Sequence, residues 1–204
     1  MKQDPSSKQT LRSDLLLQRA GLSLQEQEDK AIKLTNIISK LPIFQKSHTI
    51  AGYWPMKGEI SALTLIELAY LLQKSCYLPA LDPKNKDLLT FVEYKPGDPL
   101  IANRFGIMEP DSSRGSIHAN ELDLVLTPLL AFDKQGRRIG MGLGYYDRSF
   151  SFLKKNVGSP QPFLLGLAYE WQEVETLPED EWDIRLSGIA TEKRFMEFKD
   201  LNGG

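Results

Sequence analysis

The chain has 204 residues, 41% of them hydrophobic, which is enough to bury one sizeable core, so we expect residues 1–204 to form a single domain. Its 25 Lys and Arg residues are interleaved with 27 Asp and Glu residues and the net charge is -2, which argues against a nucleic-acid-binding surface. Cys76 is the single cysteine and charges interrupt every apolar run well before a membrane span of roughly 18 residues, so we expect a cytoplasmic protein with no disulfide and no membrane partner.

The first segment, residues 5–19, has the pattern of a helix with one basic face. Lys8, Arg12 and Arg19 stand at i, i+4 and i+11, which brings all three cations onto one side of such a helix. A charged face of this kind is usually solvated, but it also suits phosphate binding. The residues by themselves leave both interpretations open.

A second helix and a strand follow. Ser23-Leu24-Gln25-Glu26 has the pattern of a capping box, and the helix after it is predicted to continue until Pro42. Its apolar residues recur at helical spacing and should pack in the core; they are Ala31, Leu34, Ile38 and Leu41. The β-branched and aromatic run His48–Trp54 then predicts a buried strand that ends at Pro55 and delivers the loop Met56–Glu59.

Glu59 stands immediately before the next predicted helix, residues 60–74, whose apolar face is formed by Leu65, Leu68, Ala69 and Leu72. A carboxylate in this place has two explanations. It stabilises the N-terminus of the helix, which contributes about 0.3–1 kcal/mol. Alternatively, it accepts hydrogen bonds from a substrate, because strand ends in α/β sheets carry ligand sites.

The middle of the chain is predicted to contain two short strands, Cys76–Pro79 and Leu88–Glu93, and then a bounded loop, Phe105–Pro110. Phe105 and Met108 in this loop suit either the lining of an apolar pocket or the ordinary core. Periodicity does not separate the two interpretations.

A short apolar strand, Asp123–Pro128, precedes the segment that concentrates the most backbone freedom and charge, Gly136–Arg148. We call residues 140–144 the glycine loop, because every second residue in it is a glycine. Glycine permits positive φ and lets main-chain N–H groups approach a ligand closely. A helix predicted to begin at Tyr145 would aim its unpaired N–H groups and its positive dipole end at the same ligand.

The glycine loop matches neither a Walker motif nor a dinucleotide fingerprint. A tight turn between a strand and a helix is the ordinary explanation of a lone Gly-x-Gly. Three alternating glycines flanked by Arg137, Arg138, Asp147 and Arg148 instead favour an anion site, with phosphate as the ligand.

The helix after the glycine loop is predicted to run to about Lys155, and Phe163–Tyr169 and Gly188–Thr191 are predicted strands, the second of them the last in the chain. Strands that alternate with helices indicate the α/β class, here a three-layer α/β/α fold with a largely parallel central sheet. His48 and His118 accompany no nucleophile motif, which argues against acyl-enzyme chemistry.

The pattern Arg138-x-Gly140-x-Gly142-x-Gly144-Tyr145-Tyr146-Asp147-Arg148 resembles the signature of the 5-formyltetrahydrofolate cyclo-ligase family, also called 5,10-methenyltetrahydrofolate synthetases. Four further stretches occur in that family's order and extend the resemblance over nearly the whole chain. They are Lys8-Gln9-Thr10-Leu11-Arg12, Tyr53-Trp54-Pro55-Met56-Lys57-Gly58-Glu59-Ile60, Phe105-Gly106-Ile107-Met108-Glu109-Pro110, and Leu177-Pro178 followed by Trp182-Asp183.

The resemblance implies ATP-dependent closure of 5-formyltetrahydrofolate to 5,10-methenyltetrahydrofolate, with ATP and Mg²⁺ as cofactors. We further expect a monomeric enzyme. It assigns ATP binding to Lys8, Arg12, Arg138, Ile139, Gly140, Met141, Gly142, Leu143, Gly144, Tyr145 and Tyr146. It assigns folate binding to Trp54, Glu59, Met141, Gly142, Leu143, Gly144 and Tyr145. Asp147 and Asp183 would hold the metal, and Arg138, Tyr145 and Asp147 would carry the catalysis.

The chain departs from the common family pattern at Met141, Leu143 and Trp182, where many relatives have other residues, so side-chain contacts there are not carried over. Two other functions compete with the implied one. A non-catalytic nucleotide- or folate-binding module would keep the fold without turnover. A sugar-phosphate isomerase or an acyl-transferring enzyme on a similar scaffold would need no ATP.

Overall fold

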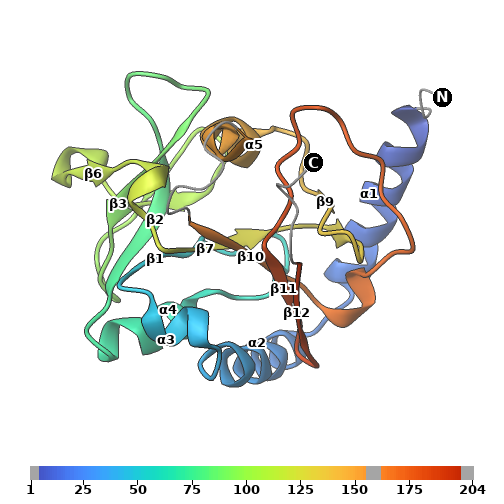
Figure 1. Cartoon of the computed structure of the whole chain (residues 1–204), viewed down its shortest axis with the longest axis horizontal. Coiled ribbons are helices and arrows are strands. Elements are labelled where there is room, and N and C mark those ends of the chain that lie inside the picture. The colour runs from blue at the N-terminus through green and yellow to red at the C-terminus, as the bar shows by residue number, and fades with distance from the viewer. Residues whose placement is uncertain (1–4, 155–161, 199–204) are drawn as a thin grey trace.

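The computed structural model describes residues 5–154 and 162–198, with side chains from residue 9 onward. Its centre is an eight-stranded sheet in the order β12-β11-β10-β7-β1-β2-β3-β6 (Figure 1). The strands are β1 (Thr49–Ala51), β2 (Ser75–Leu81), β3 (Leu89–Glu93), β6 (Ser116–Ile117), β7 (Leu124–Pro128), β10 (Phe163–Leu167), β11 (Gly188–Ala190) and β12 (Phe195–Glu197).

The neighbouring strands β11, β10, β7, β1 and β2 pair in parallel, whereas β12, β3 and β6 are added in antiparallel orientation at the two sides. The predicted α/β class with a largely parallel sheet is therefore confirmed. Gly188–Thr191 is not the last strand as predicted, because β12 follows it. The chain reverses after Thr191, whose N–H donates to the carbonyl of Arg194 at 2.9 Å, and three residues then pair with β11.

Helices cover both faces of the sheet. They are α1 (Pro5–Ala20), α2 (Leu24–Ile38), α3 (Pro42–Lys46), α4 (Leu63–Leu71) and α5 (Tyr145–Ser149), with 3₁₀ turns at Ser112–Arg114, Ala119–Glu121, Ser151–Lys154 and Glu170–Gln172. Figure 1 shows α2, α3 and α4 against one face and α5 against the other. Two strand pairs, β4 (Ile101–Ala102) with β5 (Met108–Glu109) and β8 (Ala131–Phe132) with β9 (Arg138–Ile139), lie beside the main sheet.

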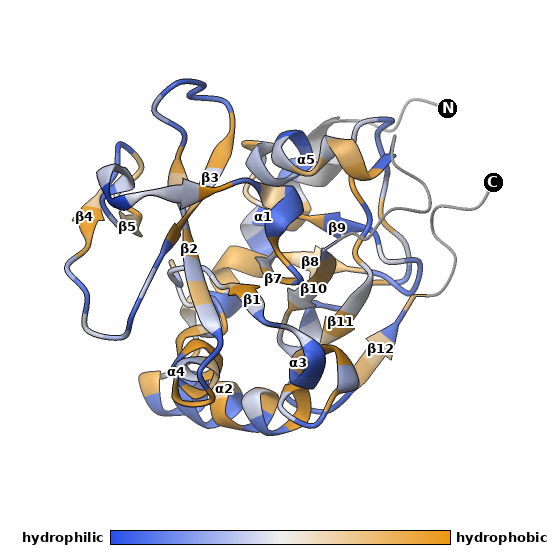
Figure 2. Ribbon diagram, turned by 60° about the vertical axis from the view of Figure 1, so that its left-hand side comes forward, coloured by the Kyte–Doolittle hydropathy of each residue, from blue (hydrophilic) through white to orange (hydrophobic). Residues whose placement is uncertain are grey.

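Alternating side chains of the strands build one core on each face of the sheet. Ile50 and Leu126 pack with Leu34 of α2 and Leu65 of α4, whereas Val125 on the next position of β7 belongs to the cluster on the other face. Because successive side chains of a strand point to opposite faces, each face of the parallel sheet has its own buried core. In Figure 2 the colour of α2 alternates between hydrophobic and hydrophilic along the helix, as expected of a helix with one buried face.

Several predicted boundaries differ from the structure. The capping box of Ser23 and Glu26 is present, and α2 begins where it was expected. The helix predicted over residues 60–74 is confined to α4, since Gln73 has a φ of 60°, and Leu72 is 55% exposed instead of packing in the core. The strand predicted over His48–Trp54 is shorter, because β1 ends at Ala51.

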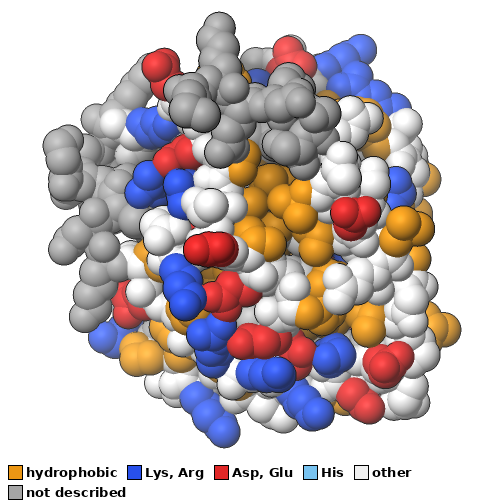
Figure 3. All heavy atoms as spheres, turned by 90° about the vertical axis from the view of Figure 1, so that its right-hand side faces the viewer, with side chains coloured by type: hydrophobic (Ala, Val, Ile, Leu, Met, Phe, Trp, Pro, Cys, Tyr) orange, Lys and Arg blue, Asp and Glu red, His pale blue; other side chains and the backbone are white. Residues whose placement is uncertain are grey.

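The charges of the chain stay interleaved in three dimensions on the face drawn in Figure 3, where basic and acidic side chains alternate in the lower half. Within residues 5–154 and 162–198, none of the helices combines the length and the apolar character needed to cross a membrane.

Candidate active site

A cavity of about 1020 Å³ opens at the carboxyl ends of β1, β2 and β7, the edge where α/β sheets bind ligands. Its walls include almost every residue that the sequence singled out: Arg12, Trp54, Glu59, Arg138, Ile139, Gly140, Met141, Gly142, Leu143, Gly144, Tyr145, Tyr146, Asp147 and Asp183. The side chain of Lys8 lies outside the described residues. Segments that are up to 171 positions apart in sequence, from Arg12 to Asp183, thus meet in one space.

The glycine loop uses two of its three glycines for backbone geometry. Gly142 has a φ of 92° and Gly144 has a φ of 66°, whereas Gly140 does not adopt the left-handed region. The following helix, α5, has only five residues, which is shorter than predicted, and its macrodipole is correspondingly small. The positive charge available to an anion here therefore comes from arginine side chains more than from a helix dipole.

Arg12 crosses from α1 to the glycine loop. Its Nε donates a hydrogen bond to the carbonyl of Gly140 at 3.0 Å, and a Cβ added to Gly142 would lie 3.5 Å from its Cζ. The packing of α1 explains this reach, because Leu15 is buried against Ile139 and Leu177. The structure therefore places Arg12 in the wall of the cavity, partly exposed.

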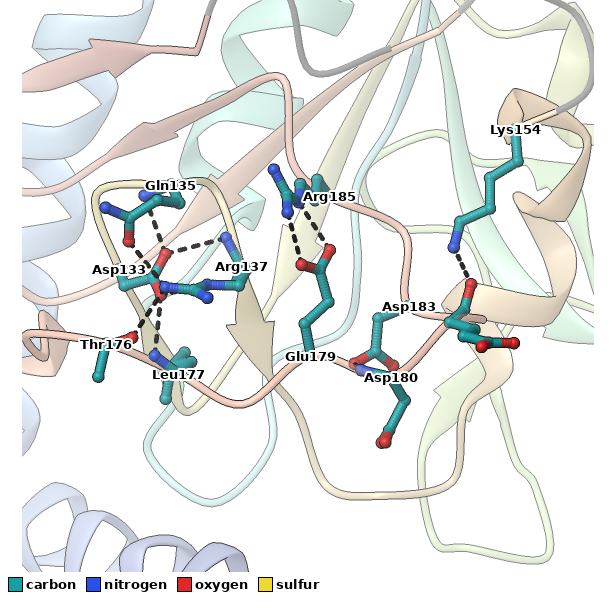
Figure 4. Close-up of polar contacts among 11 residues, drawn as sticks. Asp133, Gln135, Arg137, Lys154, Thr176, Leu177, Glu179, Asp180, Asp183 and Arg185 are labelled. Carbon is teal, nitrogen blue, oxygen red and sulfur yellow. Dashed lines mark hydrogen bonds and ion pairs between the residues drawn. The ribbon is translucent and has the colours of Figure 1, made fainter. Parts of the chain in front are cut away.

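Two other arginines near the glycine loop have structural partners. Arg137, expected to flank an anion site, instead donates from Nε to the fully buried carboxylate of Asp133 at 2.6 Å (Figure 4). The same carboxylate accepts from the backbone N–H of Gln135 and of Leu177, both at 2.9 Å, so it fastens the β8–β9 turn to the segment that leads to Asp183. Arg148 donates to the carbonyl of Leu143 at 2.9 Å.

Arg138 and Asp147 form the charged centre of the cavity. Arg138 Nη2 donates to Asp147 Oδ1 at 2.7 Å, and the side chains are 8% and 22% exposed. The N–H of Ile184 donates to the same Oδ1 at 3.1 Å, while Arg138 Nη1 donates to the carbonyl of Ile184. These contacts hold Ile184, the residue after Asp183, against Asp147.

Asp147 and Asp183, the two acidic residues expected to hold a metal, offer carboxylates of the kind that Mg²⁺ uses. No group of three or more His, Cys, Asp or Glu side chains that would form a complete metal cage occurs in the described residues. Mg²⁺ usually takes one or two carboxylates and completes its shell with phosphate oxygens and water. Asp147 and Asp183 both line the cavity, and the N–H of Asp180 orients Asp183 by donating to its Oδ2 at 2.9 Å (Figure 4).

Glu59 also lines the cavity. α4 begins only at Leu63, with Ala62 as its N-cap, so the explanation of Glu59 as a helix-end carboxylate is wrong. Its Oε2 accepts from the N–H of Met56 at 3.0 Å, and its Oε1 lies 3.6 Å from Arg19 Nη1. Burial raises the pKa of this carboxyl, and the charge of Arg19 opposes that rise.

Aromatic and apolar side chains also line the cavity. Phe105 and Met108 both line the cavity, so the pocket interpretation of their loop is correct. The ring of Phe105 meets Tyr145 edge to face at 5.9 Å, and Tyr145 is fixed by Arg104, which donates to its hydroxyl at 2.6 Å. Tyr146 is buried at its hydroxyl, which has no hydrogen-bond partner among the described residues, and burial raises its pKa strongly.

The contacts of some residues in and beside the cavity could not be predicted from the sequence. Asn103 donates to Glu109 Oε2 at 2.9 Å, and both line the cavity from the β4–β5 pair. Arg19 was expected beside Lys8 and Arg12 on a basic face, but it is 1% exposed and turned into the protein. A period of 3.6 residues places side chains on one side of a helix, yet it does not say where that side becomes buried.

Comparison with known proteins decides the family. Residues 4–192 match the model of the 5-formyltetrahydrofolate cyclo-ligase family. The chain belongs to this family. It is 38% identical to the 5-formyltetrahydrofolate cyclo-ligase of Haemophilus influenzae, covering 89% of this chain and 96% of that one, and 34% identical to that of Escherichia coli, covering 88% and 97%.

Solved structures of cyclo-ligase relatives share the fold. The 5,10-methenyltetrahydrofolate synthetase of Aquifex aeolicus superposes with a TM-score of 0.79 at 33% identity, covering 95% of this chain and 93% of that one. The synthetase of Mycoplasma pneumoniae gives a TM-score of 0.69 at 26% identity, covering 91% and 98%. The chain is therefore an enzyme of the cyclo-ligase family with the mixed, mostly parallel sheet of its relatives.

Proposed function

We propose that the chain closes 5-formyltetrahydrofolate to 5,10-methenyltetrahydrofolate at the expense of ATP, with release of ADP and phosphate. The observation that carries this proposal is the shared cavity: the glycine loop, Arg12 and Arg138 line the same space as Trp54 and Glu59. Groups that suit phosphates thus share one cavity with groups that suit a pterin. We also propose that the enzyme works as a monomer in the cytoplasm.

The chemistry explains why both ligands must share the cavity. Ring closure has to expel the formyl oxygen, which is a very poor leaving group. In the proposed reaction that oxygen attacks the γ-phosphorus and the bond from phosphorus to the β,γ-bridging oxygen breaks, which releases ADP. N10 then attacks the activated carbon and loses its proton, and the carbon–oxygen bond breaks with departure of phosphate. Each step depends mainly on alignment and on neutralisation of charge.

On the phosphate side, Arg12, Arg138 and the backbone of residues 139–146 are proposed to hold ATP, together with Lys8. Arg138 is paired with Asp147 at 2.7 Å, and the guanidinium has further N–H groups that can donate to phosphate oxygens. Asp147 and Asp183 are proposed to hold Mg²⁺, which supplies neutralisation of phosphate charge when bound. Arg138 then faces the charge that develops during transfer.

On the folate side, Trp54 and the segment 141–145 are proposed to contact the flat ring system, and Tyr145 to meet the reacting end of the folate. Glu59 is proposed to accept hydrogen bonds from N–H donors of the pterin. Its side chain is 12% exposed, and Glu59 lines the cavity. A carboxylate held there by Met56 pairs two N–H donors well, because it offers two acceptor oxygens.

Turnover itself is the test. The protein is incubated with 5-formyltetrahydrofolate, ATP and Mg²⁺ while the absorbance of the methenyl product and the release of ADP are followed together. The proposal expects one ADP for each product and no product without ATP. Binding of both ligands without turnover would instead support a non-catalytic module.

Arg12→Ala should raise the KM for ATP by roughly tenfold and change thermal stability little, because a partly exposed cation contributes little to folding. Steady-state kinetics with varied ATP and a melting curve measure the two effects. An unchanged KM for ATP would show that Arg12 does not bind ATP and only holds the glycine loop through the Gly140 carbonyl.

Glu59→Gln should lower kcat/KM for 5-formyltetrahydrofolate by roughly 10- to 100-fold while the KM for ATP stays within about twofold, since the amide keeps the shape and loses one acceptor and the charge. Kinetics at varied folate and varied ATP separate the two ligands. Normal folate kinetics in this variant would refute the substrate role of Glu59.

A further inference from the structure

The turn that presents Glu59 has an uncommon backbone. Lys57 and Gly58 both have positive φ, 49° and 73°, and the turn is closed by the N–H of Glu59, which donates to the carbonyl of Met56 at 3.0 Å. Two successive residues in the left-handed region suit asparagine or glycine, and a lysine there costs about 1 kcal/mol or more. Such a conformation persists only where surrounding contacts enforce it.

Arg19 of α1 makes the contacts that enforce it. Its Nε donates to the carbonyl of Lys57 at 2.8 Å, and its Nη1 lies 3.6 Å from Glu59 Oε1. A Cβ added to Gly58 would lie 3.1 Å from the Arg19 carbonyl oxygen, so the turn is also pressed against the helix backbone. The Arg19 side chain therefore contacts both the carbonyl of Lys57 in the strained turn and the carboxylate of Glu59, which the turn presents.

The cost of burying Arg19 argues that it does more than fill space. Its side chain is 1% exposed, and neither Nη1 nor Nη2 makes a hydrogen bond of normal length within the described residues. A buried ion pair of this kind is often no more stabilising than apolar residues of similar volume. An apolar side chain would fill this position, but it would bring no positive charge to Glu59.

We propose that Arg19 is a positioning residue: it fixes the 56–59 turn and keeps the Glu59 carboxylate ionised and directed into the cavity. This inference rests on the proposed folate role of Glu59. Arg12, seven residues earlier on the same helix, contacts the glycine loop, and seven residues span about 10.5 Å along a helix. The helix α1 thus sets the distance between the phosphate side and the folate side of the cavity.

The charged and titratable groups near Glu59 determine the pH at which its carboxylate becomes protonated. Burial raises the pKa of Glu59, and Arg19, the N–H of Met56 and Lys57 lower it, in that order. Glu59 in turn acts on the phenols of Tyr53, Tyr146 and Tyr169, which are neutral at ordinary pH because burial raises the pKa of each. When the charge of Arg19 is removed, burial raises the pKa of Glu59 further. The carboxylate of Glu59 then becomes protonated at a higher pH.

The experiment compares Arg19→Gln with Arg19→Lys, which keeps the charge but not the planar guanidinium. Arg19→Gln should raise the KM for 5-formyltetrahydrofolate by roughly tenfold and leave the KM for ATP within about twofold. The acid limb of kcat/KM for the folate should move up by about one pH unit or more. Arg19→Lys should restore the acid limb while folate KM stays raised.

A matched control removes the cation of another ion pair in which the carboxylate is buried. Lys30 Nζ lies 2.8 Å from Glu192 Oε1, with side chains 26% and 6% exposed, and neither residue lines the cavity. Lys30→Gln should lower the melting temperature as an unpaired buried carboxylate does, without moving folate KM or the acid limb. Equal kinetic changes in Lys30→Gln and Arg19→Gln would reduce Arg19 to a stability role and overturn the proposal.

The double variant Arg19→Gln with Glu59→Gln covers the case in which the single variant fails to fold, because it leaves no buried charge unpaired. The account predicts that it shows the same pH profile as Glu59→Gln alone, since Arg19 acts on that limb through Glu59. A further shift of the limb in the double variant would contradict it. If Glu59→Gln itself is normal, the folate role of Glu59 fails; if only Arg19→Gln is normal, the positioning role alone fails.

Discussion

Asp147→Asn should lower kcat by about 100-fold or more and raise the Mg²⁺ concentration that gives half-maximal rate. The asparagine retains an acceptor for the N–H of Ile184 and for Arg138, so the ring of contacts around Oδ1 can persist. It loses the charge that a divalent cation requires. The expected deficit therefore lies in metal-dependent turnover and not in folding, and steady-state rates titrated with Mg²⁺ measure it.

Asp123→Asn is the control for that substitution. The Asp123 carboxylate accepts from the N–H of His48 at 2.7 Å and of Thr49 at 2.9 Å, and it lies outside the cavity lining. Burial by itself would raise the pKa of Asp123, but these bonds outweigh it and the pKa is lowered, so the change should cost stability without altering the Mg²⁺ dependence. An Asp147→Asn enzyme that matches the unaltered enzyme in kcat and in metal requirement would exclude Asp147 as a metal ligand.

Gly142→Val should weaken ATP binding by about 100-fold, measured by calorimetry in the absence of folate. Two causes act together. A φ of 92° is unfavourable for a β-branched residue, and the added side chain would press on Arg12, whose Cζ lies 3.5 Å from a Cβ at this position. The variant should therefore lose both the loop conformation and the arginine that crosses it.

The control for backbone strain is Gly97→Val. Gly97 has a φ of 94°, nearly that of Gly142, but a Cβ added there meets no atom within 4 Å, and the residue does not line the cavity. Both variants should lose stability to a similar degree because both force valine into a left-handed conformation. ATP affinity should fall only in Gly142→Val, and equal affinity in the two variants would remove the glycine loop from the ATP site.

The sequence was sufficient for most of the fold because each parallel strand is a short apolar run followed by a helical or loop segment. β7 and β10 were predicted nearly at their observed positions. β12 was missed, since three residues after a turn carry too little alternation to distinguish a strand from a loop. The helix predicted over residues 60–74 was too long because apolar residues continue past the point where Gln73 turns to positive φ.

The candidate site was predictable where its residues are adjacent in sequence, as in the glycine loop and Asp147. It was not predictable where a role depends on burial or on distant partners. The sequence placed Arg19 on a basic helix face and Arg137 beside an anion site. In the structure Arg19 faces Glu59, and Arg137 pairs with Asp133. Charge and spacing are local properties, whereas the partner of a charge is fixed by how α1 and the β8–β9 pair pack.

The most direct test of the central claim follows the formyl oxygen itself. 5-Formyltetrahydrofolate labelled with ¹⁸O in the formyl group is converted with ATP and Mg²⁺, and the released phosphate is analysed by mass spectrometry. Transfer of the γ-phosphoryl group to that oxygen predicts one ¹⁸O atom in each phosphate formed. Methenyl product accompanied by unlabelled phosphate, in a control that excludes exchange of the label with water before reaction, would contradict the account.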